Sequence, residues 1–106
     1  MSETQFIVYL DEAQRNRYRH WHIWRFGEIT GFLIQYEAFI NEQWYPVVRY
    51  DATHGQPHRD VLHPDGSQSK EMYSYYNNAE VVTIGKQDIF RNWQQYRASF
   101  EREMER

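Results

Sequence analysis

The amino-acid sequence predicts an α+β fold: an antiparallel sheet of four or five strands, built as a meander of hairpins, with a C-terminal amphipathic helix on one face. Two observations predict this fold. Residues 5–62 consist mainly of apolar runs and alternating positions separated by short polar breaks, which is typical of half-buried strands. Residues 86–105 repeat their apolar residues at helical spacing instead. A run of strands followed by a helix is typical of this fold class.

Composition limits the classes of protein that this chain can form. Its 106 residues predict a single domain spanning 1–106 with one core, and the aromatic share of 18% lets a few large rings fill that core. The net charge of −3 gives no overall positive field to attract nucleic acid. The absence of cysteine excludes disulfides and thiolate chemistry. Without a signal peptide or an apolar run of membrane-spanning length, we expect a soluble cytoplasmic protein that does not bind a membrane.

Three strands are predicted before residue 41. Residues 1–4 are expected to fray, and the apolar run 5–10 forms the first strand. In the second strand, 15–26, four arginines are interspersed with aromatic residues, so this strand has a basic leading edge. The third strand, 29–40, places its even-numbered apolar residues on one face.

The rest of the sheet is predicted from shorter signals. The polar break 41–43 joins the third strand to a fourth over 44–51 as a hairpin. Residues 58–63 form a short strand. The segment 67–83 is interpreted as a short strand and a loop, with another strand over 81–84.

The C-terminal helix is predicted over Lys86–Glu105, with Gly85 as its N-cap. Its apolar stripe recurs at i, i+4, i+7 and i+11 and must dock on the sheet, because a helix of this length is not stable alone. The stripe consists of Ile89, Trp93, Tyr96 and Phe100.

The stretch richest in reactive side chains runs from Val47 to Gly66, and its loop covers 49–66. It holds three of the five histidines and two of the three prolines. Gly55 and Pro57 favour a rigid corner, because one permits positive φ and the other fixes its own φ. Such loops between strands are where binding and catalytic residues gather.

One interpretation of this stretch is metal-free acid–base chemistry on RNA. Cleavage requires a base for the 2′-hydroxyl proton, an acid for the leaving oxygen and a cation for the phosphate. His54 and His58 suit the acid and base roles, since histidine titrates near neutral pH, and Arg49 or Arg59 suits the phosphate. Asp51 or Asp60 is expected to orient a histidine ring.

Further arginines are predicted to contact nucleic acid. Arg59 lies within the same stretch, while Arg17, Arg19 and Arg25 are interspersed with aromatic rings in the second strand. Arginine beside aromatic rings suits single-stranded nucleic acid. The alternative is that these arginines form only the solvated edge of a strand.

A second interpretation is metal binding. His54, His58 and His63 supply imidazole ligands of the kind that zinc, nickel and iron accept. Their spacing matches no familiar zinc signature, so we expect no cofactor, with a divalent metal as the alternative.

A third interpretation is purely structural. Arg49 and Asp51 share a strand face and can form an ion pair there, while the histidines cap the loop by donating to backbone carbonyls.

The stretch V-V-R-Y-D-A-T-H-G-Q-P-H-R-D, followed by H-P-D-G, resembles the signature of a small uncharacterised prokaryotic domain family. The same family ends in a helix with the pattern N-W-x-x-Y-R-x-x-F, which residues 92–100 supply here. This resemblance covers most of the chain and implies no settled activity.

The run Arg49-Tyr50-Asp51, followed by clustered histidines, is also similar to TumE-type toxins of toxin–antitoxin modules. That similarity implies a small RNA-directed toxin that an antitoxin-like protein neutralises. Our first hypothesis is therefore a toxin-like domain acting on RNA. The second is a non-enzymatic module that presents a rigid His/Arg/Asp loop to a protein partner, and the third is a metal-dependent hydrolase. An exposed sheet edge would also permit a homodimer.

Overall fold

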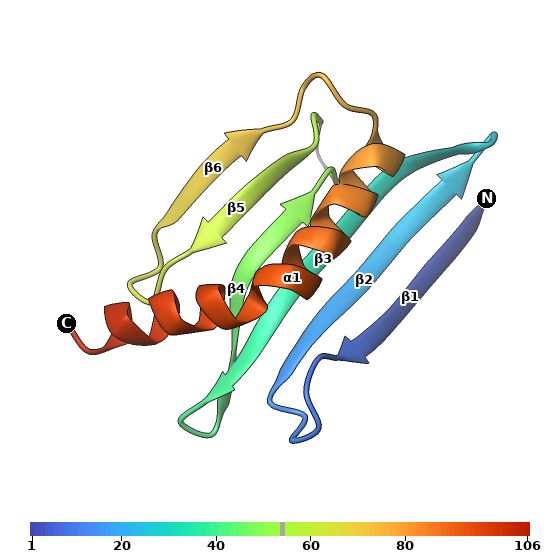
Figure 1. Ribbon diagram of the computed structural model, residues 1–106. Helices are drawn as coiled ribbons and strands as arrows, with labels where there is room; N and C mark the ends of the chain where they lie inside the picture. The colour runs from blue at the N-terminus through green and yellow to red at the C-terminus, as the bar shows by residue number, and fades with distance from the viewer. Residues whose placement is uncertain (54) are drawn as a thin grey trace.

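The computed structural model describes residues 1–53 and 55–106. Within these residues it contains one antiparallel sheet of six strands, paired in chain order, and a helix laid obliquely across one face (Figure 1). The elements are β1 (Ser2–Tyr9), β2 (Asn16–Arg25), β3 (Glu28–Ile40), β4 (Gln43–Asp51), β5 (His58–Leu62), β6 (Gln68–Met72) and α1 (Asn78–Met104). The predicted α+β class is therefore confirmed, but the predicted count of four or five strands is wrong.

Both edge strands differ from the prediction in their bounds. β1 begins at Ser2, opposite Trp24 of β2, where the sequence predicts a frayed start. β6, the short strand predicted within 67–83, is exposed at every position and polar except for Met72, so its sequence lacks the alternation that would set its bounds. Its pairing with β5 holds it in the sheet.

The helix begins at Asn78, so the predicted start at Lys86 is wrong. A capping box fixes the true start: the Glu80 amide donates to Asn77 Oδ1 at 2.8 Å, and the Asn77 amide donates to Glu80 Oε1 at 3.0 Å. The strand predicted over 81–84 is therefore also wrong, and its two valines are buried on the helix instead.

Gly85, the predicted N-cap, lies inside α1 against the ring of Tyr50. A Cβ at this position would lie 2.8 Å from Tyr50 Cγ and 2.9 Å from Cδ2. The glycine therefore allows α1 to approach β4 more closely than any other residue would.

The predicted apolar stripe of α1 packs on β3 and β4. Trp93 contacts Tyr36 with ring centroids 6.4 Å apart, and Phe100 contacts Tyr45 at 5.5 Å. Ile89 is completely buried. The core comprises Tyr18, Phe32, Ile34, Tyr36, Ala38, Ile40, Val47, Val48, Tyr50, Ala52, Val81, Val82, Ile89 and Phe100. No helix in the described part of the chain has the length and apolar character needed to cross a membrane.

Arg97 ties the C-terminal half of α1 to the sheet. Its guanidinium donates to Asn16 Oδ1 at 3.0 Å and to the Phe39 carbonyl at 2.9 Å. The Tyr36 hydroxyl donates to the same Asn16 oxygen at 2.6 Å. These bonds connect the helix with the start of β2 and the end of β3, so they fix the angle at which α1 crosses the sheet.

His20 is a buried histidine on the helix side of β2. Its ring stacks on Phe6 at 4.4 Å, and its Nε2 lies 2.7 Å from Nδ1 of His22. Burial lowers the pKa of His20 to about 4 from 6.5, with further lowering by the charges of His22 and Lys86. The folded protein therefore holds this ring neutral at pH values where the unfolded chain protonates it.

This shift predicts an acid-sensitive stability. As pH falls from about 7 to about 4, the unfolded state binds a proton at His20 and the folded state does not, so the free energy of unfolding decreases. The decrease is expected to be as much as about 3 kcal/mol, at about 1.4 kcal/mol per pKa unit. Denaturant titrations from pH 8 to pH 4 measure it.

The variant His20→Phe is expected to flatten this pH dependence while remaining folded at pH 8. His63→Gln, which changes a histidine elsewhere in the structure, is the control. It should leave the slope of the unfolding free energy against pH unchanged. An equal slope in wild type and His20→Phe would show that another group causes the acid sensitivity.

Candidate functional site on the open face of the sheet

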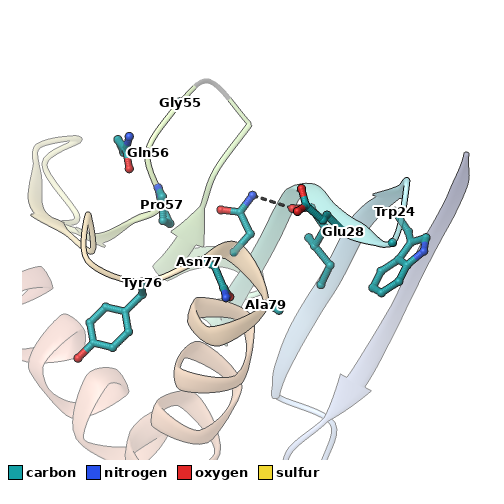
Figure 2. Close-up of a pocket in the computed structure, with 11 residues that line it drawn as sticks. Trp24, Glu28, Gly55, Gln56, Pro57, Tyr76, Asn77 and Ala79 are labelled. Atoms are coloured by element: carbon teal, nitrogen blue, oxygen red, sulfur yellow. Dashed lines mark hydrogen bonds between the residues drawn. The ribbon is translucent and has the colours of Figure 1, made fainter.

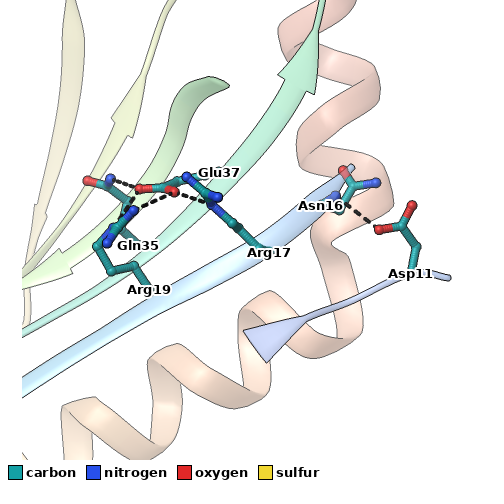
Figure 3. A network of polar contacts seen from close by, with 6 residues as sticks. All are labelled: Asp11, Asn16, Arg17, Arg19, Gln35 and Glu37. Atoms are coloured by element: carbon teal, nitrogen blue, oxygen red, sulfur yellow. Dashed lines mark hydrogen bonds and ion pairs between the residues drawn. The ribbon is translucent and has the colours of Figure 1, made fainter. Parts of the chain in front are cut away.

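Because α1 covers one face of the sheet, side chains on the other face are left open, and a carboxylate is nevertheless buried there. Glu37 of β3 is only 6% exposed. Arg17 Nε donates to its Oε1 at 2.7 Å, and Arg19 Nε donates to its Oε2 at 3.1 Å. Gln35 Nε2 donates to Oε2 at 2.6 Å (Figure 3). Three donors from two strands thus surround one carboxylate.

The charges in this network stabilise one another. Burial alone would raise the pKa of Glu37, but hydrogen bonds from Arg19, Arg17 and Gln35 outweigh it and hold the pKa below 4.5. The guanidinium of Arg17 also lies 3.7 Å from the centroid of the Trp44 ring, so Arg17 is fixed on two sides. The carboxylate therefore stays ionised near neutral pH.

The same sheet face carries further polar side chains on β4 and β5. Arg49 Nε donates to Gln35 Oε1 at 2.7 Å, and the strand register places Arg49 opposite Asp60. Asp60 is 4% exposed, and its Oδ2 lies 3.2 Å from Nε2 of His58. Within the described part of the chain, Asp60 Oδ1 has no hydrogen-bond partner.

His58 lies at the start of β5 and contacts Asp60 on the same face. Its Nδ1 lies 3.1 Å from the carbonyl oxygen of Gln56, while its Nε2 faces Asp60. Both neighbours only accept, so both bonds form together only when the ring carries both protons. We call the polar residues that share this face the open-face cluster: Arg17, Arg19, Gln35, Glu37, Arg49, His58 and Asp60.

The open-face cluster contains several residues that the sequence singled out. Arg49 and His58, predicted as catalytic, lie on the same face, and so do Arg17 and Arg19. Asp51 lies opposite His58 in the register, but its Oδ1 accepts from the amide and hydroxyl of Thr53 at 2.7 and 2.8 Å. Asp51 therefore caps the turn, and Asp60 is the carboxylate that contacts His58.

Other predicted residues lie elsewhere. Arg59 points toward the helix, where it donates to the Tyr96 hydroxyl at 3.0 Å and pairs with Glu71. Arg25 lies at the end of β2 beside the Met1 sulfur. The predicted nucleic-acid contacts by Arg59 and Arg25 therefore do not belong to the open-face cluster.

The three histidines predicted as alternative metal ligands do not form one group. His63 contacts Glu103 at 2.8 Å, near the C-terminal end of α1. It lies five residues from His58 along an extended chain, about 16 Å at the rise of a strand. His54 lies outside the described residues. Among the residues that are described, no three histidine, aspartate or glutamate side chains are arranged to hold a metal ion.

Gln35 and Glu37 are the members of the cluster that the sequence did not single out. Each lies at an odd-numbered position of β3, between buried apolar residues, and looks like an ordinary solvent-facing residue. A signal was present nonetheless. A meander pairs neighbouring strands, so polar residues at odd positions of β2 and β3 and at Arg49 are expected to line one face.

A pocket of about 450 Å³ lies at the end of the sheet where α1 begins, apart from the cluster (Figure 2). Trp24, Pro57 and Tyr76 contribute apolar surface to it. Gln56 also lines it, and this residue accepts from His58 through its carbonyl, so the segment 56–58 joins the pocket to the cluster. With Glu28 as its one charged lining residue within the described chain, the pocket suits an uncharged group better than a phosphate.

Together these features define an α+β domain in which one sheet face is packed by a helix and the other carries an arginine–carboxylate cluster. A family model described as a domain of unknown function (DUF7718) matches residues 1–106, so the chain belongs to this family. No curated protein and no solved structure gives a significant match. Any activity must therefore be argued from the site itself.

Proposed function

We propose that the open-face cluster binds the phosphodiester backbone of single-stranded RNA and cleaves it by metal-free acid–base chemistry. The observation that carries this proposal is that Arg17, Arg19 and Arg49 lie on one uncovered sheet face with His58 at its end. A guanidinium matches the geometry of a phosphate and remains charged at any physiological pH.

Each residue of the cluster has a distinct role in this proposal. Arg49 and Arg19 contact the phosphate, and Arg19 is well placed because its side chain is 43% exposed. Glu37 orients Arg17 and Arg19 by accepting hydrogen bonds from both guanidinium groups. His58 gives its Nδ1 proton to the leaving oxygen in place of the Gln56 carbonyl, while Asp60 orients the ring through Nε2.

The second proton-transfer group is assigned on sequence grounds. His54 precedes His58 by four residues in the motif and lies outside the described residues. We assign it the removal of the 2′-hydroxyl proton, since cleavage of this type requires a base as well as an acid.

The proposal predicts that the purified domain cleaves a labelled single-stranded oligoribonucleotide in the presence of EDTA. The products should end in a 2′,3′-cyclic phosphate. His58→Gln is expected to lower kcat about 100-fold, the usual contribution of one proton-transfer group. Arg49→Ala is expected to raise KM and to weaken the salt dependence of binding, because one phosphate contact is lost.

Arg91→Ala is the matched control, because it removes the same charge from a residue beside a pocket between α1 and Tyr18 of β2, on the packed side. Thermal melts confirm that each variant is folded. Wild-type protein that leaves RNA intact at low salt would contradict the proposal, and so would His58→Gln with full activity.

A second candidate is a non-enzymatic module that binds a protein. It is favoured by the half-buried aromatic residues that flank the cluster, including Phe39 and Trp44, whose rings pack 5.2 Å apart. The first candidate expects an antitoxin-like partner on the open face, and the second expects another protein partner there. Protection of Arg49 and His58 from chemical modification in a co-purified complex would distinguish such a partner from one bound elsewhere.

A further inference from the structure

β1 is an edge strand whose outer side is open. The Leu10 amide donates to the Asn16 carbonyl at 2.8 Å. In the same register Val8 lies opposite Tyr18 and Phe6 lies opposite His20. In an antiparallel ladder, alternate residues bond to a given neighbour. The even-numbered residues of β1 therefore bond to β2. The outward-facing N–H and C=O groups belong to Glu3, Gln5, Ile7 and Tyr9.

This edge lacks the features that usually prevent strand pairing. It is eight residues long, without proline or lysine, and Phe6, Ile7 and Tyr9 are each about 40% exposed. Its one charged side chain, Glu3, accepts from the indole of Trp21 at 2.7 Å and so stays with its own sheet. The opposite edge, β6, is shorter and carries Lys70 and Glu71.

We propose that β1 pairs with β1 of a second copy of this chain, antiparallel about a two-fold axis at Phe6. In this register Gln5 lies opposite Ile7 of the second copy, and Glu3 lies opposite Tyr9. Every outward-facing N–H and C=O of the strand then has a partner. The two six-stranded sheets become one continuous sheet.

A second copy fits this edge because the strand is self-complementary. The register places Phe6 opposite Phe6 at the axis, where each ring already stacks on its own His20. It keeps the two Glu3 carboxylates at opposite ends of the pairing, each facing a tyrosine. α1 packs on β3 and β4, so it does not cover Phe6.

The dimer also leaves the open face free. An antiparallel pairing in the plane of the sheet has its two-fold axis perpendicular to that plane, so both open-face clusters lie on the same side. The pairing is therefore independent of the proposed function. The interface buries little surface area beyond the two β1 strands. We therefore expect a dimer of micromolar affinity, as is typical of small interfaces.

A disulfide experiment tests the register directly, because the chain has no cysteine of its own. Phe6→Cys places two thiols opposite each other at the axis, where paired Cα atoms lie about 4.5–5.5 Å apart and a disulfide forms readily. Thr4→Cys is the matched control on the same face, with its thiols about 13 Å apart along the strands. On mild oxidation we expect a covalent dimer of Phe6→Cys and none of Thr4→Cys.

A second variant tests the pairing without a thiol. Ile7→Pro removes one outward-facing N–H and leaves the bonds to β2 in place, so it should abolish self-association in sedimentation velocity while circular dichroism is retained. Gln68→Lys, on the opposite edge strand β6, should leave self-association unchanged. Wild-type protein that stays monomeric at millimolar concentration would overturn the proposal, as would equal oxidation of the two cysteine variants.

Discussion

Gly85→Val is expected to lower the free energy of unfolding by about 3 kcal/mol, because overpacking a core is costly. A Cβ at residue 85 would lie 2.8–3.2 Å from three carbon atoms of Tyr50. That ring cannot retreat easily, since it is 1% exposed and its hydroxyl donates to Asp88 at 2.6 Å. Denaturant unfolding measures the loss. Thr83→Val, at an exposed position of the same helix, should change stability by no more than about 0.5 kcal/mol.

Gly85→Ala gives the sharper test of the cause. In an unobstructed helix this change would stabilise the protein by about 1 kcal/mol, because alanine has the higher helix propensity. Here we expect a loss of about 2 kcal/mol, so the sign reverses. Combined with Tyr50→Ala, which removes the ring, the same substitution should become stabilising. A stabilising Gly85→Ala in the wild-type background would show that the helix and β4 are not in close contact.

The close contact at Gly85 shows where the sequence was an insufficient guide to the fold. A glycine beside a polar residue is typical of a helix boundary, and the apolar run at 81–84 resembles a short strand. The helix continues through both because the capping box at Asn77 begins it earlier and the valines pack on the sheet. The stripe from Ile89 to Phe100 was predictable, since helical periodicity alone determines which residues face the core.

The candidate site was predictable only within single strands. Alternation along β4 shows that Arg49 and Asp51 share a face. Between β4 and β5, however, the geometry of the connection decides which face the next strand presents. The sequence therefore cannot show that His58, and not Arg59, joins Arg49 on the open face.

Glu37 illustrates a second limit, because its burial depends on residues of two neighbouring strands at once. The sequence shows an acidic residue on an amphipathic strand, which is usually solvated. In the structure, two arginines of β2 and Gln35 close around it. The consequence is large enough to measure: Glu37→Ala is expected to lower the free energy of unfolding by about 3–5 kcal/mol, because two guanidinium groups lose a buried acceptor.

Glu71→Ala is the control for this prediction. Glu71 also pairs with an arginine, Arg59, but at 3.6 Å and with its side chain 56% exposed. Solvent screens such a pair, so its removal should cost less than about 1 kcal/mol. Equal losses for the two variants, measured by denaturant unfolding at pH 7, would mean that the open-face network contributes no more than an ordinary surface ion pair.

The pH dependence of the Glu37 contribution separates it from that of His20. The folded-state pKa of Glu37 is lowered, so its stabilising contribution is complete above the unfolded value of about 4.5 and is lost as pH falls through the folded pKa. The His20 contribution changes at higher pH, between about 7 and 4. Glu37→Ala should therefore reduce the slope of stability against pH below about 4.5 and leave the slope above it unchanged. A change confined to the higher range would mean that Glu37 acts on folding through His20 and not through the two arginines.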